Sequence, residues 1–382
     1  MLRQNPQDQS MYRPGLYPPA LEPAPIDWNP GSQYAPETRM WQGCPTIART
    51  RGGIVWAGWY TGGVREPDEN NCNLLFRISD IRQPFHDAPF IAINSAPAAC
   101  LRAMDIQLWV DTLGRLWVFW TQTRDSAAKD TLGRNLLYTD RIFGTFAIIC
   151  GDPDAEHPVF STPRRLCDGF LRCRPTVLQS GRWIMCPYDW ISSDRTQGRL
   201  AYCLSDDQGE NWVRRYGPAR LGETIFDEQM VAQLLDGRLW MLARTRAGEL
   251  GECFSADDGL TWTESAPSGI ANPSSRFWID RLHSGRLLLV NHFGFTGRSH
   301  MTALLSEDDG KTWPYRLLLD ARSGVSYPDA FEAPDGLVTV LYDCGRTKEK
   351  EICLAQFREA DILAGHVVSQ DTVLGRVLSK AP

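Results

Sequence analysis

The chain has 382 residues, of which 43% are hydrophobic and 23% charged, as in an ordinary globular protein. Its net charge of −6 and the lack of a basic cluster argue against a nucleic acid as a partner. No segment approaches the roughly 18 consecutive apolar residues that a membrane-spanning helix needs, so we expect no membrane partner either.

Residues 1–35 are rich in proline and polar side chains and contain no apolar run of the kind that a secretory signal requires. We therefore expect an extended N-terminal arm, followed by one domain over residues 36–382, in a cytoplasmic protein. The eleven cysteines show no C-x-x-C spacing, and several lie in apolar runs, as Cys150 and Cys186 do. They are expected to be small buried side chains in a reducing compartment. The histidines show no metal-ligand spacing, so the sequence predicts neither a metal site nor a cofactor.

One pattern recurs along the chain: an apolar strand, a turn with a central glycine, and a second apolar strand. The copies begin with PTIARTRGGIVWAGW and end with DAFEAPDGLVTVLYD, and they are 48 to 67 residues apart. Their turn glycines are Gly53, Gly114, Gly181, Gly237, Gly285 and Gly336. A four-stranded propeller blade takes about 40–50 residues, more with long loops. Six hairpins therefore predict an all-β fold, a six-bladed β-propeller of four-stranded antiparallel blades.

A second motif, Ser-x-Asp-x-Gly-x-Thr-Trp, follows three of these hairpins at spacings of 50 and 51 residues. It occupies residues 205–212 (with Asn211 in place of Thr), 255–262 and 306–313, and a weaker trace lies at Ser79-Asp80. In this Asp box the aspartate accepts hydrogen bonds from nearby amides, glycine supplies a positive φ, and tryptophan packs the turn against its blade. We expect a structural role for it, in the turn between the third and fourth strands.

Two features are expected near the end of the chain. A short helix is predicted around Phe357 to Ala364, after the last strand of the repeat. The strand that closes the ring is expected from the N-terminal arm or from the tail between His366 and Leu378.

Asp boxes on a six-bladed frame resemble the sialidase superfamily, in its BNR-repeat branch, from about Trp41 to Leu363. The resemblance implies a tyrosine nucleophile with a glutamate partner, an aspartate acid/base, and three arginines that bind the substrate carboxylate. Tyr327, eight residues before Asp335, matches the nucleophile.

The same resemblance assigns the partner of the nucleophile and two of the arginines. Glu228 and Arg244 keep the family's interval of sixteen residues between the glutamate and the second arginine. Arg298, which precedes the last Asp box, matches the third arginine. A carbohydrate is the substrate that this set of residues implies.

The first arginine of the family is missing, because Gly43 stands at its position while the nearby Pro45 is kept. An arginine–carboxylate fork contributes roughly 1.5–3 kcal/mol, so its loss is expected to weaken binding of sialic acid. Glycine leaves room there for a different or bulkier group, and Arg65 in the next loop is a substitute cation. The missing arginine therefore predicts weak turnover of sialosides and better activity on another sugar.

The acid/base and the remaining pocket residues are left as sets of candidates. The first-blade loop offers three carboxylic acids, Glu66, Asp68 and Glu69. Pocket candidates at the inner ends of the second and third blades are Arg102, Asp105, Gln107 and Arg174.

Three functions remain open at this stage. The first is a retaining exo-glycosidase for a terminal acidic sugar. The second is a related enzyme, hydrolase or lyase, for another sugar. The third is a non-catalytic propeller that binds glycans or a protein, since one fold serves many functions.

Overall fold

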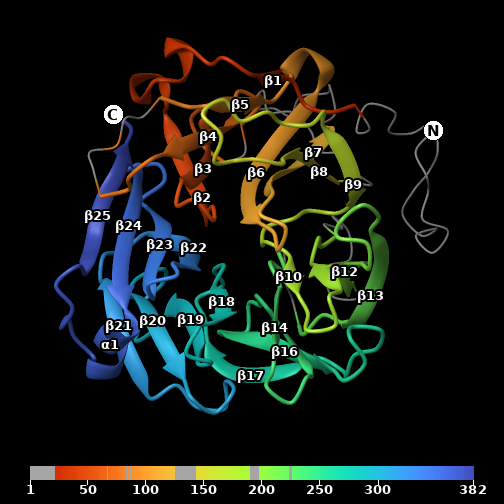
Figure 1. Cartoon of the computed structure of the whole chain (residues 1–382), viewed down its shortest axis with the longest axis vertical. Helices are drawn as coiled ribbons and strands as arrows, with labels where there is room; N and C mark the ends of the chain where they lie inside the picture. Colours follow the sequence, from red (N-terminus) through yellow and green to blue (C-terminus); the bar gives the residue numbers. More distant parts are fainter. Residues whose placement is uncertain are drawn as a thin grey trace.

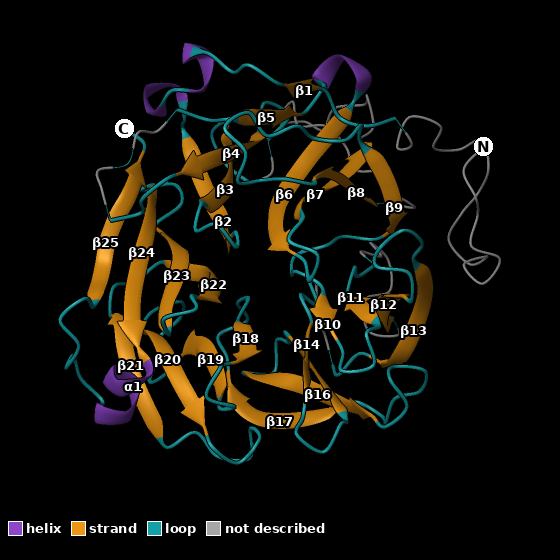
Figure 2. Cartoon of the chain, in the orientation of Figure 1, coloured by secondary structure: helices purple, strands orange, loops and turns teal. Residues whose placement is uncertain are grey.

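The structure is a computed structural model, and it describes residues 22–66, 68–82, 85, 88–124, 143–189, 198–222 and 226–382. Residues 1–21 of the expected N-terminal arm lie outside the described residues. Six antiparallel sheets are arranged around one axis, which confirms the six-bladed β-propeller (Figure 1). The strands β2, β6, β10, β14, β18 and β22 lie nearest the axis, and later strands of each blade lie towards the rim (Figure 2).

The first three blades follow one another along the chain. The first contains β2 (Trp41–Arg49), β3 (Val55–Gly62), β4 (Cys72–Ile78) and β5 (Ile91–Asn94). The second contains β6 (Leu101–Val110), β7 (Leu116–Arg124), β8 (Gly144–Cys150) and β9 (Arg164–Asp168). The third contains β10 (Thr176–Val177), β11 (Trp183–Met185), β12 (Arg199–Ser205) and β13 (Val213–Ala219). A further short strand, β1 (Ile26–Asp27), pairs with β5, so part of the expected arm is a fifth strand of the first blade.

The other three blades repeat the same order. The fourth contains β14 (Met230–Gln233), β15 (Leu239–Ala243), β16 (Glu249–Ser255) and β17 (Ala266–Ala271). The fifth contains β18 (Trp278–Arg281), β19 (Leu287–His292), β20 (Met301–Ser306) and β21 (Tyr315–Asp320). The sixth contains β22 (Val325–Glu332), β23 (Leu337–Cys344), β24 (Glu351–Arg358) and β25 (Val373–Lys380). The tail after His366 thus supplies the outer strand of the last blade, and the ring closes where β2 packs against β22.

The six predicted turns lie where the repeat placed them, between the first and second strand of each blade. Their glycines have φ values from +79° to +99°, a region in which a side chain is strained. Four short helices complete the described elements: the 3₁₀ helices η2 (Ser32–Tyr34), η3 (Pro36–Thr38) and η4 (Pro97–Ala99), and α1 (Glu359–Ala364). The α-helix lies within the predicted range, and none of the described helices is long and apolar enough to span a membrane.

The Asp boxes join the third and fourth strands of their blades, as expected. In the box at 306–313, Asp308 accepts hydrogen bonds from the Ser306 hydroxyl (2.8 Å) and from the amide (2.8 Å) and hydroxyl (2.6 Å) of Thr312. Trp313 packs against the hydrophobic core. The boxes at 205–212 and 255–262 repeat these contacts.

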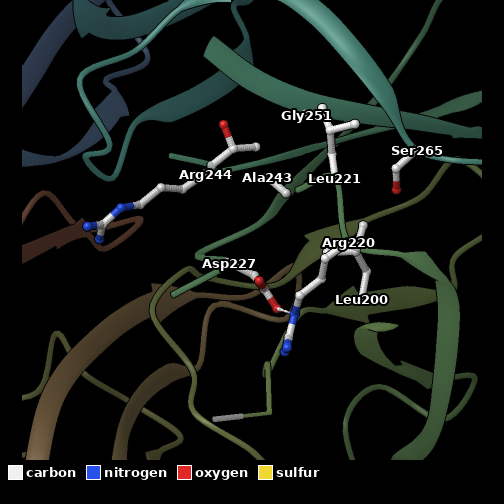
Figure 3. A pocket seen from close by; sticks show the side chains of 9 residues that line it. Leu200, Arg220, Leu221, Asp227, Ala243, Arg244, Gly251 and Ser265 are labelled. Carbon is white, nitrogen blue, oxygen red and sulfur yellow. Dashed lines mark hydrogen bonds and ion pairs between the residues drawn. The ribbon is translucent and has the colours of Figure 1, made fainter. Parts of the chain in front are cut away.

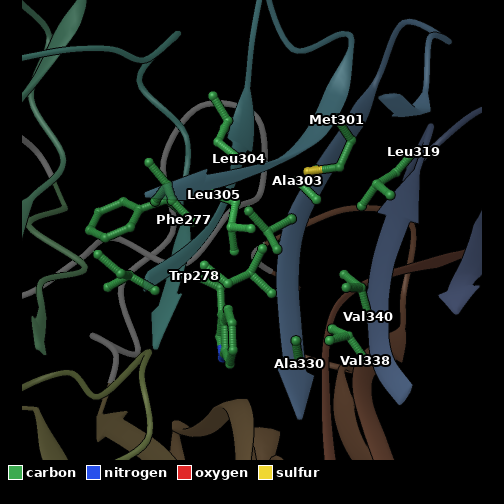
Figure 4. Close-up of a cluster of buried hydrophobic side chains, with 14 of the residues drawn as sticks. Phe277, Trp278, Met301, Ala303, Leu304, Leu305, Leu319, Ala330, Val338 and Val340 are labelled. Atoms are coloured by element: carbon green, nitrogen blue, oxygen red, sulfur yellow. The ribbon is translucent and has the colours of Figure 1, made fainter. Parts of the chain in front are cut away.

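The core consists of apolar side chains between neighbouring blades. Figure 4 shows part of the largest cluster, where Leu305 of β20 and Trp278 of β18 meet residues of the sixth blade such as Val340. All eleven cysteines are free and all but Cys100 are buried, as the sequence predicted.

Candidate active site

Each blade presents one residue from the position nine residues before its turn glycine, in the inner strand or just before it. These residues are Cys44, Asp105, Arg172, Glu228, Arg276 and Tyr327, and each is at most 5% exposed. Four of them, Cys44, Asp105, Glu228 and Tyr327, have positive φ values of 42° to 57°. In three strands the pairing register shifts at this point, which is the mark of a β-bulge. Such bulges re-aim a side chain, and backbone strain of this kind clusters at functional sites.

Tyr327 and Glu228 form the centre of this ring. The Tyr327 hydroxyl donates a hydrogen bond to Glu228 Oε1 at 2.6 Å, within the distance expected of a nucleophile and its base. Arg244 Nη1 contacts both partners, at 2.9 Å from Glu228 Oε2 and 3.2 Å from the Tyr327 hydroxyl oxygen. Arg298 lies on the same tyrosine, with Cζ 5.4 Å from the ring centroid. The four residues predicted to converge therefore do so, while their roles in a reaction stay predictions.

Electrostatics fixes where the shared proton resides. Burial raises the pKa of Tyr327, and the negative charge of Glu228 raises it further, so the phenol stays neutral. Burial would also raise the pKa of Glu228, but Arg244 and then Arg172 outweigh it and hold that pKa at about 2. The site thus contains an ionised hydrogen-bond acceptor, Glu228, and a neutral donor, Tyr327.

Arg172 is a buried part of the site that the sequence analysis missed. Its guanidinium is paired with Asp105, lies 3.6 Å from Glu228 Oε1 and donates to Cys44 Sγ at 3.1 Å. Its Cζ is also 4.5 Å from the Tyr327 ring centroid. The signal was present in the sequence, because the nine-residue offset that gives Tyr327 also gives Arg172 when it is applied to the third blade.

The prediction of free space beside Gly43 is wrong, because the Arg346 side chain fills that space. A Cβ built on Gly43 would lie 2.8 Å from Arg346 Cδ and 2.9 Å from its Nε. Arg346 follows β23, and its Cζ stands 4.1 Å from the centroid of the Tyr327 ring. No room is left for a bulkier ligand group at this point, so the reason given for a non-sialic substrate is removed.

The first-blade loop brings one of its acids to the site. Glu66 Oε2 accepts a hydrogen bond from Arg346 Nη1 at 2.6 Å, and the glutamate oxygens lie 3.9 Å from Cys44 Sγ. Asp68 is used within its own loop, where it accepts from the Asn70 amide at 2.9 Å.

The other two loop candidates are not brought to Tyr327 by any described contact. The Arg65 side chain is exposed, and its carbonyl accepts a hydrogen bond from Asn71. Glu69 lies half-buried in the same loop.

Asp105 is the second-blade candidate that reaches the centre. It is 1% exposed and paired with Arg172, and its Oδ2 accepts no hydrogen bond from any described residue. Burial raises its pKa from 3.8 to about 7, against the opposing charge of Arg172. Asp105 can therefore hold a proton near neutral pH, which an ordinary aspartate does not.

The remaining pocket candidates are spread along the axis. Arg102 is buried, and its charge lowers the pKa of Tyr60, which burial raises. Gln107 Oε1 accepts a hydrogen bond from Arg276 at 3.3 Å.

The structure does not bring Arg174 to Tyr327. Arg174 pairs with Asp280, and both line a cavity of about 300 Å³. Arg49 and Arg51, beside the turn of the first blade, line the same cavity.

A small cavity lies behind Arg244, between the third and fourth blades. It holds about 10 Å³, room for one water at most, and the guanidinium of Arg244 points away from it (Figure 3). Arg220 and Asp227 form an ion pair of 2.7 Å in its wall, and the Asp227 carbonyl accepts the Arg244 amide at 2.8 Å. This buried pair therefore fixes the backbone on which Glu228 and Arg244 stand.

Cys44, Glu66 and Asp105 lie close enough to share a cation, since their potential ligand atoms are within 4.8 Å of one another. Two guanidinium groups already stand among them, because Arg172 contacts Cys44 and Asp105 while Arg346 contacts Glu66. Burial also raises the pKa of the Cys44 thiol well above its usual range. A neutral thiol beside two cations is a poor metal ligand, so we assign no metal to this cluster.

Six four-stranded blades around one axis form a propeller like those of sialidases. The model of the BNR repeat-like domain family matches residues 153–340. The chain is 31% identical to a sialidase of Micromonospora viridifaciens over 156 residues, 37% of this chain and 23% of that protein. It is 27% identical to an anhydrosialidase of Macrobdella decora over 168 residues, 39% of this chain and 22% of that protein. These matches support the sialidase superfamily, in its BNR-repeat branch, as the family that this chain resembles.

Solved structures agree on the fold. The Hadza microbial sialidase Hz136 superposes with a TM-score of 0.67 at 18% identity, over 86% of this chain and 68% of that one. The intramolecular trans-sialidase of Ruminococcus gnavus superposes with a TM-score of 0.65 at 14% identity, over 89% of this chain and 98% of that one. The matched segments span less than a quarter of the two curated relatives, so those relatives support the family and leave this chain's activity open.

Proposed function

We propose that this protein is a retaining exo-glycosidase that removes a terminal sugar carrying a carboxylate. The observation that carries the proposal is the 2.6 Å hydrogen bond from Tyr327 to the ionised Glu228, with Arg244 in contact with both. A neutral phenol is a weak nucleophile at pH 7 and needs an adjacent base to accept its proton. Glu228 is the group in that position.

The reaction has two steps. In the first, the Tyr327 oxygen bonds to the anomeric carbon, its proton passes to Glu228, and the leaving oxygen takes a proton from an acid. In the second, water attacks the same carbon and gives a proton to the conjugate base of that acid, the bond to Tyr327 breaks, and the phenol regains its proton from Glu228. Tyrosine nucleophiles of this kind are an established exception to the carboxylate pair of most glycosidases.

Two neighbouring groups are candidates for the acid. Glu66 comes from the loop where the family resemblance expects it, but it is ion-paired with Arg346. Asp105 has a pKa of about 7 because of its burial, which suits a proton donor at neutral pH. Activity of Glu66→Gln and Asp105→Asn separates the two, since loss of the true donor should lower turnover of substrates with poor leaving groups and spare those with an activated phenol leaving group.

Arg244 and Arg298 favour an anionic substrate. Arg298 donates to the Ser274 carbonyl at 3.0 Å and forms no ion pair with any residue in the described part of the chain. A half-buried arginine without a carboxylate partner beside the nucleophile supports binding of a carboxylate by its planar fork.

Replacing Tyr327 by Phe tests the proposal. The change removes the hydroxyl and keeps the ring, so hydrolysis of fluorogenic sugar-acid glycosides should fall on the order of 10³-fold or more while binding persists. Tyr315→Phe is the matched control, because that hydroxyl contacts Glu307 in an exposed turn. Full activity in Tyr327→Phe would refute the proposed nucleophile. Tight binding of a sugar by wild type without turnover would favour a glycan-binding propeller, for which the 5% exposure of Tyr327 is the supporting observation.

A further inference from the structure

We propose that Arg346 is a ligand-binding residue of this site, delivered from the sixth blade to the place where the first blade lacks an arginine. The inference rests on the proposed function and adds a third cation to Arg244 and Arg298. It also explains why Gly43 stands where it does.

The position of Arg346 is held by buried groups. Its Nε donates to Asp343 Oδ2 at 2.9 Å, and Asp343 in turn accepts hydrogen bonds from the Cys44 amide (2.8 Å) and the Ser326 hydroxyl (2.6 Å). Nη1 donates to Glu66 at 2.6 Å. The carboxylate of Asp343 therefore ties Arg346 to the inner strands of the first and last blades, a support that makes its orientation reproducible.

One side of the guanidinium is left for a ligand. Nη2 makes only a 3.5 Å contact with the Ser326 hydroxyl, at the limit of a hydrogen bond. Its N–H groups thus have donor capacity to spare. Because Cζ is 4.1 Å from the centroid of the Tyr327 ring, a group bound to Nη2 lies next to the nucleophile.

The present position of the Arg346 side chain excludes any residue larger than glycine at position 43. Any side chain at residue 43 would begin with a Cβ 2.8 Å from Arg346 Cδ, closer than real contacts allow. An arginine at position 43 and the present conformation of Arg346 therefore cannot coexist. Arg346 thus places a positive charge where the first-blade arginine is absent, and this charge comes from the sixth blade instead of the first.

The recognised group is a planar carboxylate on the sugar. Arg244 and Arg298 also contact Tyr327 or lie on its ring, so with Arg346 three guanidinium groups adjoin this side chain, besides that of Arg172, which is paired with Asp105. A planar anion can accept parallel hydrogen bonds from such forks, whereas a neutral sugar hydroxyl gains much less from them.

The test compares binding of N-acetylneuraminic acid and its methyl ester by calorimetry. Wild type should prefer the acid, and Arg346→Ala should lose about 10- to 100-fold in affinity for the acid and little for the ester. Arg238→Ala is the matched control, since Arg238 pairs with Asp236 on the exposed surface. If Arg346→Ala does not fold, Arg346→Lys keeps the charge beside Asp343 but lacks the fork, and should still lose part of the acid preference.

A swapped variant adds an independent check. Gly43→Arg alone should lower stability through the collision, and Gly43→Arg combined with Arg346→Ala should regain acid binding. Unchanged acid preference in Arg346→Ala, with hydrolysis that still depends on Tyr327, would overturn this inference and leave the proposed function standing. No preference for the acid in wild type, together with no hydrolysis, would overturn both.

Discussion

The buried pair of Arg172 and Asp105 gives a prediction whose size depends on pH. Both side chains are at most 3% exposed, and Arg172 also lies beside Glu228 and on the ring of Tyr327. Replacing Arg172 by Met keeps much of the volume and removes the cation. Removal of one partner from a buried pair costs about 3–5 kcal/mol of unfolding free energy, because the other charge is left without compensation.

The pH dependence follows from the carboxyl group. The folded-state pKa of Asp105 is raised from 3.8 to about 7, so the folded protein holds this proton more tightly and stability falls as pH rises through that window. Without Arg172 the attraction that opposes burial is lost and the pKa rises further. Stability of the variant should therefore keep falling above pH 7, by up to about 1.4 kcal/mol per pH unit relative to wild type.

Urea unfolding at pH 6.5 and 8.5 measures this difference. The variant should lose roughly 2 kcal/mol more at pH 8.5 than at pH 6.5, and adding Asp105→Asn should remove that extra loss. The two substitutions should thus be strongly non-additive, by more than the about 0.5 kcal/mol seen for independent sites. Additive effects that do not change with pH would refute the assignment of Asp105 as the partner.

Two further predictions concern stability away from the reaction. Burial lowers the pKa of His292 from 6.5 to about 4, so the free energy of unfolding should fall by up to about 3 kcal/mol as the pH is lowered from 6.5 to 4. In urea titrations His292→Asn should flatten this pH profile, and an unchanged profile would contradict the prediction. Gly310→Ala would place a Cβ 2.4 Å from Trp240, whereas Gly285→Ala has a similar φ and nothing within 4 Å. Both should suffer about 1–2 kcal/mol of backbone strain, and only Gly310→Ala should lose about 1–3 kcal/mol more in chemical unfolding. Equal losses would show that the collision relaxes without penalty.

The sequence by itself determined the fold, because each signal of the fold is local. A glycine turn between two apolar strands needs only a positive φ at one residue, and an Asp box closes its hydrogen bonds within eight residues. Six copies of the first pattern predict six small sheets, and a propeller is an arrangement in which the faces of all six sheets are buried against one another. The family resemblance could assign Tyr327 and Glu228 from similarly local intervals, since Tyr327 lies eight residues before Asp335 and Glu228 lies sixteen residues before Arg244.

Tertiary structure alone decided how the site is completed. Arg346 is about 300 residues from Gly43 in sequence, and its side chain reaches that glycine only because the last blade closes the ring beside the first. Burial likewise depends on all blades together, so no local pattern indicates that Asp105 has a pKa of about 7 or that Arg172 contacts residues of four other blades. The charges, the dielectric environment and the free space at the axis all depend on residues far apart in the sequence. They can therefore be known only from the folded structure, which brings those residues together.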